Sequence, residues 1–488
     1  MLNETCLNNY FRSKFNQFSL FKYNFERLKI FQLALGFIIG VILISSQSIF
    51  LVFPLLLLAF PLRKRKFLFY VSCVFGILFF SSWNNTINNE VNSYTGKKNI
   101  EETAQVLSVE ENGFQKNILL KLDNLQGEAL AQVTIYSEIK TYDYVLIRGN
   151  LSLPYSFEDF DYPAYLRSNK IFYIFKGSVV PTGKNDGLLS KIADVKQYLL
   201  DTSQKNINTP YSAIFNGILL GDTSQIPDEI NNIFRNTGTS HILSVSGFNF
   251  TIILIFLLMF SPWIGRKRIL IISIPILIGF LFLVGIENIT AMRATIMILV
   301  YIFANLAGRK LNYLYLVSLT LALFLLEYPL SWTNLSLQLS FGSLLGLYFL
   351  SDKLKSFFKK LKLAEAVNEP LSAALAAILG TMPFTLNTFG YISMVAPVVN
   401  ILVLPFVPLI MLLGFLGEIS RIFQIETITR LIFMNVEFLL KLMTKIIEWF
   451  AGIPFAISSN PFIIFIMICL LLGLILFTDF KSFYKKYY

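Results

Sequence analysis

Three apolar runs in one stretch of the chain decide its fold class. Residues 242–310 read ILSVSGFNFTIILIFLLMFSPWIGRKRILIISIPILIGFLFLVGIENITAMRATIMILVYIFANLAGRK. The runs 242–262, 269–286 and 289–307 have close to the ~20 residues that a helix needs to cross a bilayer. Basic clusters follow the first and third runs, at Arg266-Lys267-Arg268 and Arg309-Lys310. Apolar runs that alternate with short basic loops indicate a polytopic α-helical membrane protein.

The composition of the whole chain agrees with this fold class. Apolar residues make up 55% of the 488 and charged residues 15%, with a mean hydropathy of +0.61. A soluble protein carries about 25% charged residues. Further runs of near-spanning length lie at 30–48, 67–82, 311–327, 331–350, 370–388 and 462–478, and the shorter run 49–61 is expected to return the chain through the bilayer.

Basic residues orient these runs. Lys and Arg exceed Asp and Glu by 41 to 30, and much of the excess lies in short loops. Cytoplasmic loops are enriched in Lys and Arg, which places both termini in the cytosol and the polar block 83–240 outside. We therefore predict a cytosolic N-terminal tail at 1–29, N-terminal transmembrane helices at 30–82 and a cytosolic C-terminal tail at 479–488. The polar N-terminus does not resemble a cleaved signal peptide.

The C-terminal region is less regular. Segment 391–419 is interrupted by three prolines, and the next segment, 425–452, carries five charges on one helical face: Arg430, Glu437, Lys441, Lys445 and Glu448. Each charge costs about 3 kcal/mol at the centre of a lipid-facing span, so this helix does not face lipid all round. Two arrangements remain. Both segments cross with the charged face lining a polar interior, or 391–419 re-enters and 425–452 lies in the interface.

The external block begins with a predicted barrel at 98–184. Five short alternating runs separated by turns indicate a small extracytoplasmic β-barrel of OB type. Residues 97–184 contain ten basic and eleven acidic residues, so the block has no net positive charge for phosphate binding. Its aromatic side chains are candidates for base stacking or for the barrel core: Tyr142, Tyr144, Tyr155, Phe160 and Tyr173. Residues 187–208 then predict an amphipathic helix.

The scarcity of histidine and cysteine excludes several chemistries. His241 is the only histidine, and the three cysteines are far apart. Sites that need several imidazoles, disulfide frameworks and zinc knuckles are therefore excluded, and no P-loop is present. Ser246 lies five residues after His241, but no acid orients the imidazole for nucleophilic catalysis. We expect no catalytic residue, no metal site and no cofactor.

Small and hydroxylated residues gather where the chain enters the membrane from outside, between Thr237 and Gly247. Such residues permit close helix approach and put hydroxyls within reach of water, which predicts the mouth of an aqueous path. Arg293 lies inside an apolar run, where a charge indicates function by default. It could meet phosphates, or form a structural salt bridge with Glu287. Gln338, Ser340 and Asn400 could line the same path or join helices by hydrogen bonds.

The ordered motifs of this region resemble a known family. The pattern F-x-x-T-G-T-x-H-x-L-x-x-S-G stands at 234–247, after Gly221-Asp222. Downstream come Arg293-Ala294 with Met297, then Gln338-Leu339-Ser340-Phe341, then Gly380-Thr381 with Pro383, and Pro397 with Asn400. Together they are similar to the competence domain of ComEC-type DNA-internalisation proteins. Two departures stand out: Asn249 replaces a second family histidine, and the β-lactamase-like nuclease domain of many members has no counterpart before Tyr488.

The resemblance implies a function and a set of partners. It implies a competence-type transmembrane channel domain with amphipathic helices at 187–478. This domain would pass single-stranded DNA through the bacterial inner membrane during natural transformation, without being an enzyme. The implied partners are single-stranded DNA, the lipid bilayer, a DNA receptor with uptake-pilus machinery, a separate nuclease, and a cytosolic ATPase or DNA-binding proteins; an oligomer of the chain is compatible with this set. The residues expected along the path are Asp222, Thr237, Gly238, Thr239, His241, Ser246, Gly247, Asn249, Arg293, Gln338, Ser340 and Asn400. The alternatives are a transporter of a smaller anion or metabolite on the same scaffold and, less favoured, a membrane hydrolase.

Overall fold

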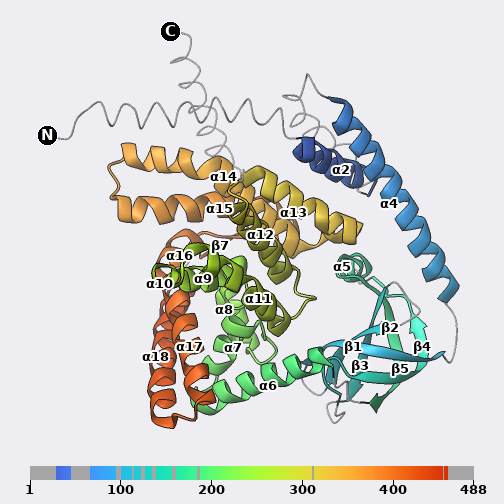
Figure 1. Ribbon diagram of the computed structural model, residues 1–488, viewed down its shortest axis with the longest axis horizontal. Coiled ribbons are helices and arrows are strands. Elements are labelled where there is room, and N and C mark those ends of the chain that lie inside the picture. The colour runs from blue at the N-terminus through green and yellow to red at the C-terminus, as the bar shows by residue number, and fades with distance from the viewer. Residues whose placement is uncertain are drawn as a thin grey trace, which may run out of the picture. The chain divides into compact units, whose positions relative to one another are not determined.

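The protein combines apolar helices with one small barrel (Figure 1). The computed structural model describes residues 29–45, 66–94, 100–112, 115–122, 127–134, 139–156, 161–183, 187–309, 313–453 and 456–459. The predicted tail 479–488, residues 1–28 of the predicted N-terminal tail, and the apolar runs 49–61 and 462–478 lie outside these residues. The chain divides into two compact units, one of 1–95, 167–169 and 311–332, the other of 96–166, 170–310 and 333–488.

Glycines bring two helices of the first unit together. The unit contains α2 (Lys29–Ser45), α4 (Lys66–Tyr94) and α13 (Tyr313–Glu327), which the short helix η3 (Pro329–Thr333) follows. A Cβ at Gly36 or Gly40 would overlap the carbonyl of Phe69 or Cys73, and one at Gly76 would overlap α2 in turn. Glycines spaced four apart allow this close approach of apolar helices.

The barrel of the second unit consists of five strands in the closed order β1-β2-β3-β5-β4. They are β1 (Ile100–Asn112), β2 (Gln115–Leu122), β3 (Glu128–Thr134), β4 (Tyr144–Ser152) and β5 (Ile171–Gly183), with the short helix α5 (Tyr162–Ser168) before β5. All pairs are antiparallel except β3 with β5, which are parallel. Alternate side chains such as Val106, Ile118 and Ile147 are fully buried inside. The predicted five-stranded barrel is confirmed.

Amphipathic and short apolar helices follow the barrel. Their bounds are α6 (Leu188–Asn206), α7 (Tyr211–Leu220), α8 (Asp228–Asn236), η2 (Ser240–Ile242), α9 (Gly247–Leu258), α10 (Ser261–Ile264), α11 (Arg266–Val284) and α12 (Ile289–Leu306). The expected run 242–262 is not one continuous helix, because Ser246 is extended and caps a helix that begins at Gly247. Apolar side chains from α6 to α12, except the short α10, share one large core with α16 to α18.

The C-terminal helices begin with a pair joined through glycines. They are α14 (Leu335–Lys360), α15 (Glu365–Phe389), α16 (Ala396–Val403), α17 (Phe406–Ile422) and α18 (Glu426–Ala451), with the small ribbon β6 (Ile392–Ser393) and β7 (Ile457–Ser458). A Cβ at Gly346 would overlap the carbonyl of Ala376, and one at Gly380 the carbonyl of Gly342. The backbones of α14 and α15 are therefore in direct contact.

Among the described residues, five helices are long and apolar enough to cross a membrane. They are Leu68–Val91, Arg266–Val284, Ile289–Leu306, Glu365–Phe389 and Ala396–Ile422. By length and composition, this number agrees with the prediction of a membrane protein with several spans.

The charged face of α18 divides between protein and surroundings. Glu437 is buried and accepts hydrogen bonds from the main chain and side chain of Asn208, and it pairs with Lys441 at 2.6 Å. Arg430, Lys445 and the other charges of this face remain exposed. Two of the five predicted charges thus pair with each other, and the buried one, Glu437, also accepts hydrogen bonds, which offsets the cost of its burial.

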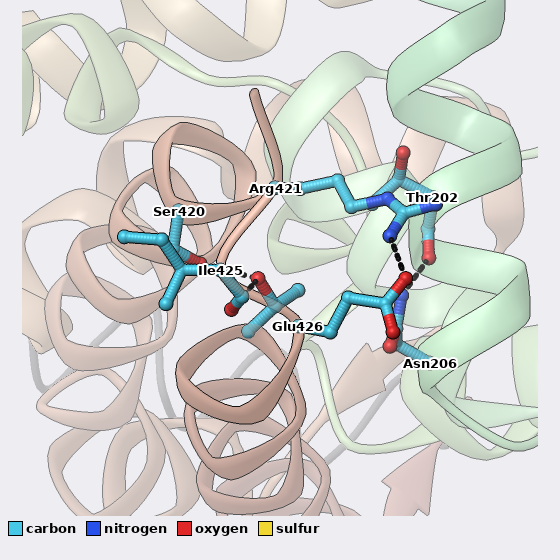
Figure 2. Close-up of polar contacts among 7 residues, drawn as sticks. Thr202, Asn206, Ser420, Arg421, Ile425 and Glu426 are labelled. Atoms are coloured by element: carbon cyan, nitrogen blue, oxygen red, sulfur yellow. Dashed lines mark hydrogen bonds and ion pairs between the residues drawn. The ribbon is translucent and has the colours of Figure 1, made fainter. Parts of the chain in front are cut away.

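Polar contacts fix the turn between α17 and α18 (Figure 2). Arg421 pairs with Glu426 at 3.2 Å, and the hydroxyls of Ser420 and Thr429 are 2.7 Å apart. Figure 2 shows Thr202 and Asn206, from the end of α6, beside the Arg421–Glu426 pair. The turn therefore lies against the amphipathic helix that leaves the barrel.

Candidate functional site

The loop between α8 and α9 is held together by its own threonines. Thr237 and Thr239 are fully buried, and their hydroxyls are 2.9 Å apart. Both hydroxyls donate to the carbonyl of Phe234 near the end of α8, and each donor–acceptor distance is 3.2 Å. The two threonines thus close the end of α8, and their contact with a substrate stays a prediction.

Gly238 lies between them and meets a distant segment. It has φ +70°, which L residues rarely adopt, and a Cβ there would lie 2.6 Å from the Cβ of Ala396 and 3.3 Å from that of Ser393. Glycine is required by conformation and by space. Because Ala396 begins α16, the loop packs directly on the start of that helix. Asn400 lies one turn further on the same face of α16.

A short hydrogen-bond chain fixes the start of α9. Ser246 accepts from the main-chain N–H of Phe248 at 3.3 Å and donates to Oδ1 of Asn249 at 3.0 Å. The Nδ2 of Asn249 donates to the carbonyl of Ile218 in α7 at 2.6 Å. The Ser246 hydroxyl therefore serves as an N-cap and orients an amide that ties α9 to α7. A hydroxyl used in this way is poorly suited to be a nucleophile.

Arg293 lies beside the same helix start. It is 6% exposed on α12, and its Nη2 is 3.7 Å from the position that a Cβ of Gly247 would take. Residues 246–249 and Arg293, predicted from separate motifs, are thus brought together. The sequence offered Glu287 as a salt-bridge partner of Arg293. The cations whose charges act on the Glu287 carboxylate are instead Lys170, Lys196 and Lys121.

Asp222 stabilises the turn after α7. Gly221 ends α7 with φ +74°, and Oδ1 of Asp222 accepts hydrogen bonds from the N–H and hydroxyl of Ser224 at 3.0 and 2.6 Å. A Cβ at Gly221 would come within 3.3 Å of Val284 at the end of α11. The Gly-Asp motif therefore shapes a contact between α7 and α11.

His241 occupies the short helix η2 and is exposed by surface area. Surrounding protein nevertheless desolvates the imidazole, which lowers its pKa below the ordinary value, while the Gly238 backbone acts in the opposite direction. The neutral form is thereby favoured. A neutral imidazole can donate and accept hydrogen bonds at this loop but gives no fixed positive charge.

The remaining predicted residues lie on α14 and α16. Gln338 and Ser340 are partly buried on the first turns of α14, whose N-cap Asn334 accepts from Leu337 at 3.3 Å. Asn400 is 6% exposed, and its Oδ1 has no hydrogen-bond partner within the described part of the chain. An unpartnered buried amide oxygen is costly, so a water or substrate donor would stabilise it. The structure places Asn400 near the Gly238 loop and keeps the α14 residues on a separate helix.

Two polar features were missed by sequence reasoning. One is the bond between Asn208 and Glu437, which joins the start of α7 to α18. The other is Lys196 on α6, which donates to the carbonyl of Val284 at 3.2 Å. A lysine next to the apolar face of an amphipathic helix is the only sequence signal for the second. Within the described residues, no three His, Cys, Asp or Glu side chains are grouped as a metal site.

Comparison with known proteins identifies the family. A family model described as Competence protein matches residues 218–481, more than half of the 488. The chain belongs to the competence protein family. The matched region begins in α7 and contains the whole α8–α9 loop, so the clustered residues all belong to the competence domain. No solved structure gives a significant match.

Three curated relatives share this domain at low identity. ComE operon protein 3 of Bacillus subtilis (strain 168) is 22% identical over 297 residues, covering 60% of this chain and 37% of that protein. An uncharacterized protein of Aquifex aeolicus (strain VF5) is 24% identical over 300 residues, 60% of this chain and 66% of the relative. Uncharacterized protein YcaI of Escherichia coli (strain K12) is 26% identical over 224 residues, 44% of this chain and 30% of the relative. The match thus spans between 30% and 66% of the length of each relative.

Proposed function

We propose that this competence-family protein is an inner-membrane channel through which single-stranded DNA enters the cytosol during natural transformation. The observation that carries the proposal is that residues of separate motifs lie together along the α8–α9 loop and the start of α9. Gly238 lies against Ala396, Asn249 reaches α7, and the Arg293 guanidinium lies at Gly247. A buried cation beside the small residue Gly247 suits the passage of a polyanion.

The barrel supports a role in receiving the strand. Its closed order, with parallel β3 and β5, matches what an OB-type fold requires, and we assign it that identity. Tyr173 and Tyr142 are buried and belong to the core, whereas Tyr144 and Tyr155 are 43% and 63% exposed. Phe160 lies outside the described residues. We therefore propose the two exposed tyrosines as stacking platforms for bases.

The orientation follows from the basic loops. With these loops in the cytosol, both termini are cytosolic and the barrel is external. A DNA receptor with uptake-pilus machinery would deliver the strand, a separate nuclease would remove its complement, and a cytosolic ATPase or DNA-binding protein would pull it inward. In this scheme the chain is a conduit and performs no chemistry of its own.

The decisive test measures entry of labelled DNA into the cytosol. A strain without the gene is complemented with wild type, Arg293→Ala or Arg293→Lys. We expect DNA to accumulate outside the inner membrane without the gene, no rescue by Arg293→Ala, and partial rescue by Arg293→Lys, which keeps the charge. Membrane abundance of each variant is measured in parallel. Unchanged cytosolic entry without the gene would refute the proposal and favour a transporter of smaller anions.

A further inference from the structure

Segment 391–400, which contains β6 and the start of α16, holds three buried polar atoms that have no hydrogen-bond partner in the described part of the chain. They are the hydroxyls of Tyr391 and Ser393 and the Oδ1 of Asn400. A buried hydroxyl or amide oxygen that is left unpaired destabilises the folded state by about 1–3 kcal/mol. The segment therefore carries several hydrogen-bonding groups that its present surroundings do not satisfy.

The α8–α9 loop lies against this segment. The position that a Cβ of Gly238 would take is 3.6 Å from the Oγ of Ser393 and 2.6 Å from the Cβ of Ala396. Asn400 follows Ala396 by one turn and lies on the same face of α16. Because glycine has no side chain, Gly238 comes close to the Ser393 hydroxyl without offering it a side-chain partner. The loop thus helps to bury polar groups that it does not pair.

An exposed aromatic ring stands beside these groups. Tyr391 directly precedes β6, and residues two apart in extended chain share a face, which places Tyr391 on the side of Ser393. The ring of Phe389, the last residue of α15, is 6.3 Å from the ring of Tyr391 and tilted by 46°. Phe389 is 41% exposed, so its ring is available for stacking. Polar groups and an aromatic face therefore occur together at the junction of α15 and α16.

The chemistry of these groups suits a nucleobase and does not suit a phosphate. Segment 391–400 contains no charged residue, and the unpaired Oδ1 of Asn400 is an acceptor that would repel a phosphate oxygen. The edges of bases present both donors and acceptors, and asparagine amides pair with them. Hydroxyl groups donate or accept as a base edge requires. An exposed aromatic ring stacks on any base, because every base has a π-face.

We propose that Tyr391, Ser393 and Asn400 form a subsite for the edge of an unstacked nucleobase, and that segment 391–400 moves away from Gly238 to admit it. The inference rests on the proposed function and names the part of the strand that this segment contacts. Opening lets the unpaired atoms bond to the base or to water, which offsets the lost packing on Gly238. Gly390 is the joint for this movement, since it has φ +74° and no atom lies within 4 Å of a Cβ built on it.

The test compares the binding of two labelled oligonucleotides of equal length, oligo(dC) and oligo(dT), to the full chain in nanodiscs of neutral lipid by fluorescence anisotropy. Both carry the same phosphates, but cytosine has an exocyclic amine that donates, where thymine has an acceptor. The cost of opening the segment is common to both and cancels in the ratio of their affinities. We expect the wild type to bind oligo(dC) about threefold to tenfold more tightly, the effect of one further hydrogen bond.

Variants of Asn400 assign this preference. Asn400→Leu keeps the size of the side chain without its hydrogen-bonding atoms, so the two oligonucleotides should bind equally. The variant also removes an unpaired buried oxygen, so it should melt at or above the temperature of the wild type. Asn400→Asp keeps acceptor oxygens but adds a negative charge, so it should weaken the binding of both oligonucleotides and retain the preference for oligo(dC).

Asn435→Leu is the matched control. Asn435 is exposed on α18, and its amide already donates to the carbonyl of Leu431 at 2.8 Å, so its replacement should leave the ratio of affinities unchanged. The inference is overturned if the wild type binds the two oligonucleotides equally or not at all, if Asn400→Leu keeps the preference, or if Asn435→Leu loses it. Melting of Asn400→Leu clearly below the wild type also overturns it, because the amide would then have a structural partner. The proposed function is judged separately, and it stands after any of these results if DNA entry still depends on the gene.

Discussion

Replacement of Gly238 by alanine tests whether the α8–α9 loop depends on its contact with α16. Two costs add. An L residue at φ +70° costs about 1–2 kcal/mol. The new Cβ would lie 2.6 Å from the Cβ of Ala396, and shifting the start of α16 to relieve this overlap costs about 1–3 kcal/mol. Gly238→Ala should therefore lower the free energy of unfolding by about 2–5 kcal/mol.

Other glycines separate the two costs. Gly390 and Gly308 have nearly the same φ, +74° and +66°, but no atom lies within 4 Å of a Cβ built on either. Gly390→Ala and Gly308→Ala should therefore lose only the conformational part, about 1–2 kcal/mol. The double variant Gly238→Ala with Ala396→Gly removes the clashing methyl group and should recover most of the steric part.

The assay is thermal unfolding of purified protein in detergent, combined with cytosolic DNA entry in complemented cells. The expected order of melting temperatures is wild type, then Gly390→Ala, then Gly238→Ala, with the double variant above Gly238→Ala. Equal melting of Gly238→Ala and Gly390→Ala would refute the packing argument. So would a double variant that is no more stable than the single one, because the two methyl groups would then not be in contact.

Three further changes test other parts of the structure. Asn249→Ala breaks the bond to α7 and should cost about 1–3 kcal/mol in thermal unfolding; Ser246→Ala should add little to it, and full additivity would contradict a shared network. Gly346→Ala forces a Cβ into a carbonyl of α15 and should sharply reduce the yield of monodisperse protein, whereas Gly279→Ala, with no atom within 4 Å, should not. Burial raises the pKa of Glu287 above 4.5, so the native state holds that proton more tightly than the unfolded state. The contribution of Glu287 to stability therefore falls as pH rises from 4.5 through the raised native pKa. At pH values above this window Glu287→Gln should have a higher melting temperature than wild type, and below pH 4.5 the two proteins should melt at the same temperature. A difference in melting temperature that does not depend on pH would contradict the assignment.

Local patterns were enough to predict most elements of the fold. The strands were readable because alternation and turn residues act within a few positions, and α6 follows the predicted amphipathic range 187–208 within two residues at each end. The run 242–262 was misjudged as one helix. Hydropathy does not register the N-cap at Ser246, which starts α9 at Gly247 and leaves residues 242–246 outside this helix although the run is apolar.

The sequence was enough to predict which residues belong to the candidate site, but not which residues they contact. Motif residues at 238, 249 and 293 were singled out, yet their partners depend on tertiary packing that no spacing reveals. Asn249 bonds a carbonyl 31 residues earlier, and Gly238 meets Ala396 across the domain. Glu287 was considered for Arg293 because it is near in sequence, but the lysines around it come from the barrel and α6. Long-range electrostatics of this kind requires the fold.

The contact between α14 and α15 has a mechanical consequence. Glycines 342, 346 and 380 place backbone against backbone, so no layer of flexible side chains lies between the helices to absorb sliding. We therefore expect α14 and α15 to move together as one rigid body. If the protein is the proposed channel, its rearrangements would fall on the neighbouring joints: the glycine at 390 that ends α15, and the interruption at Pro405 between α16 and α17. Gly238 contacts Ala396, the first residue of α16. A displacement of the segment between these two joints, residues 391–404, would therefore also move the α8–α9 loop.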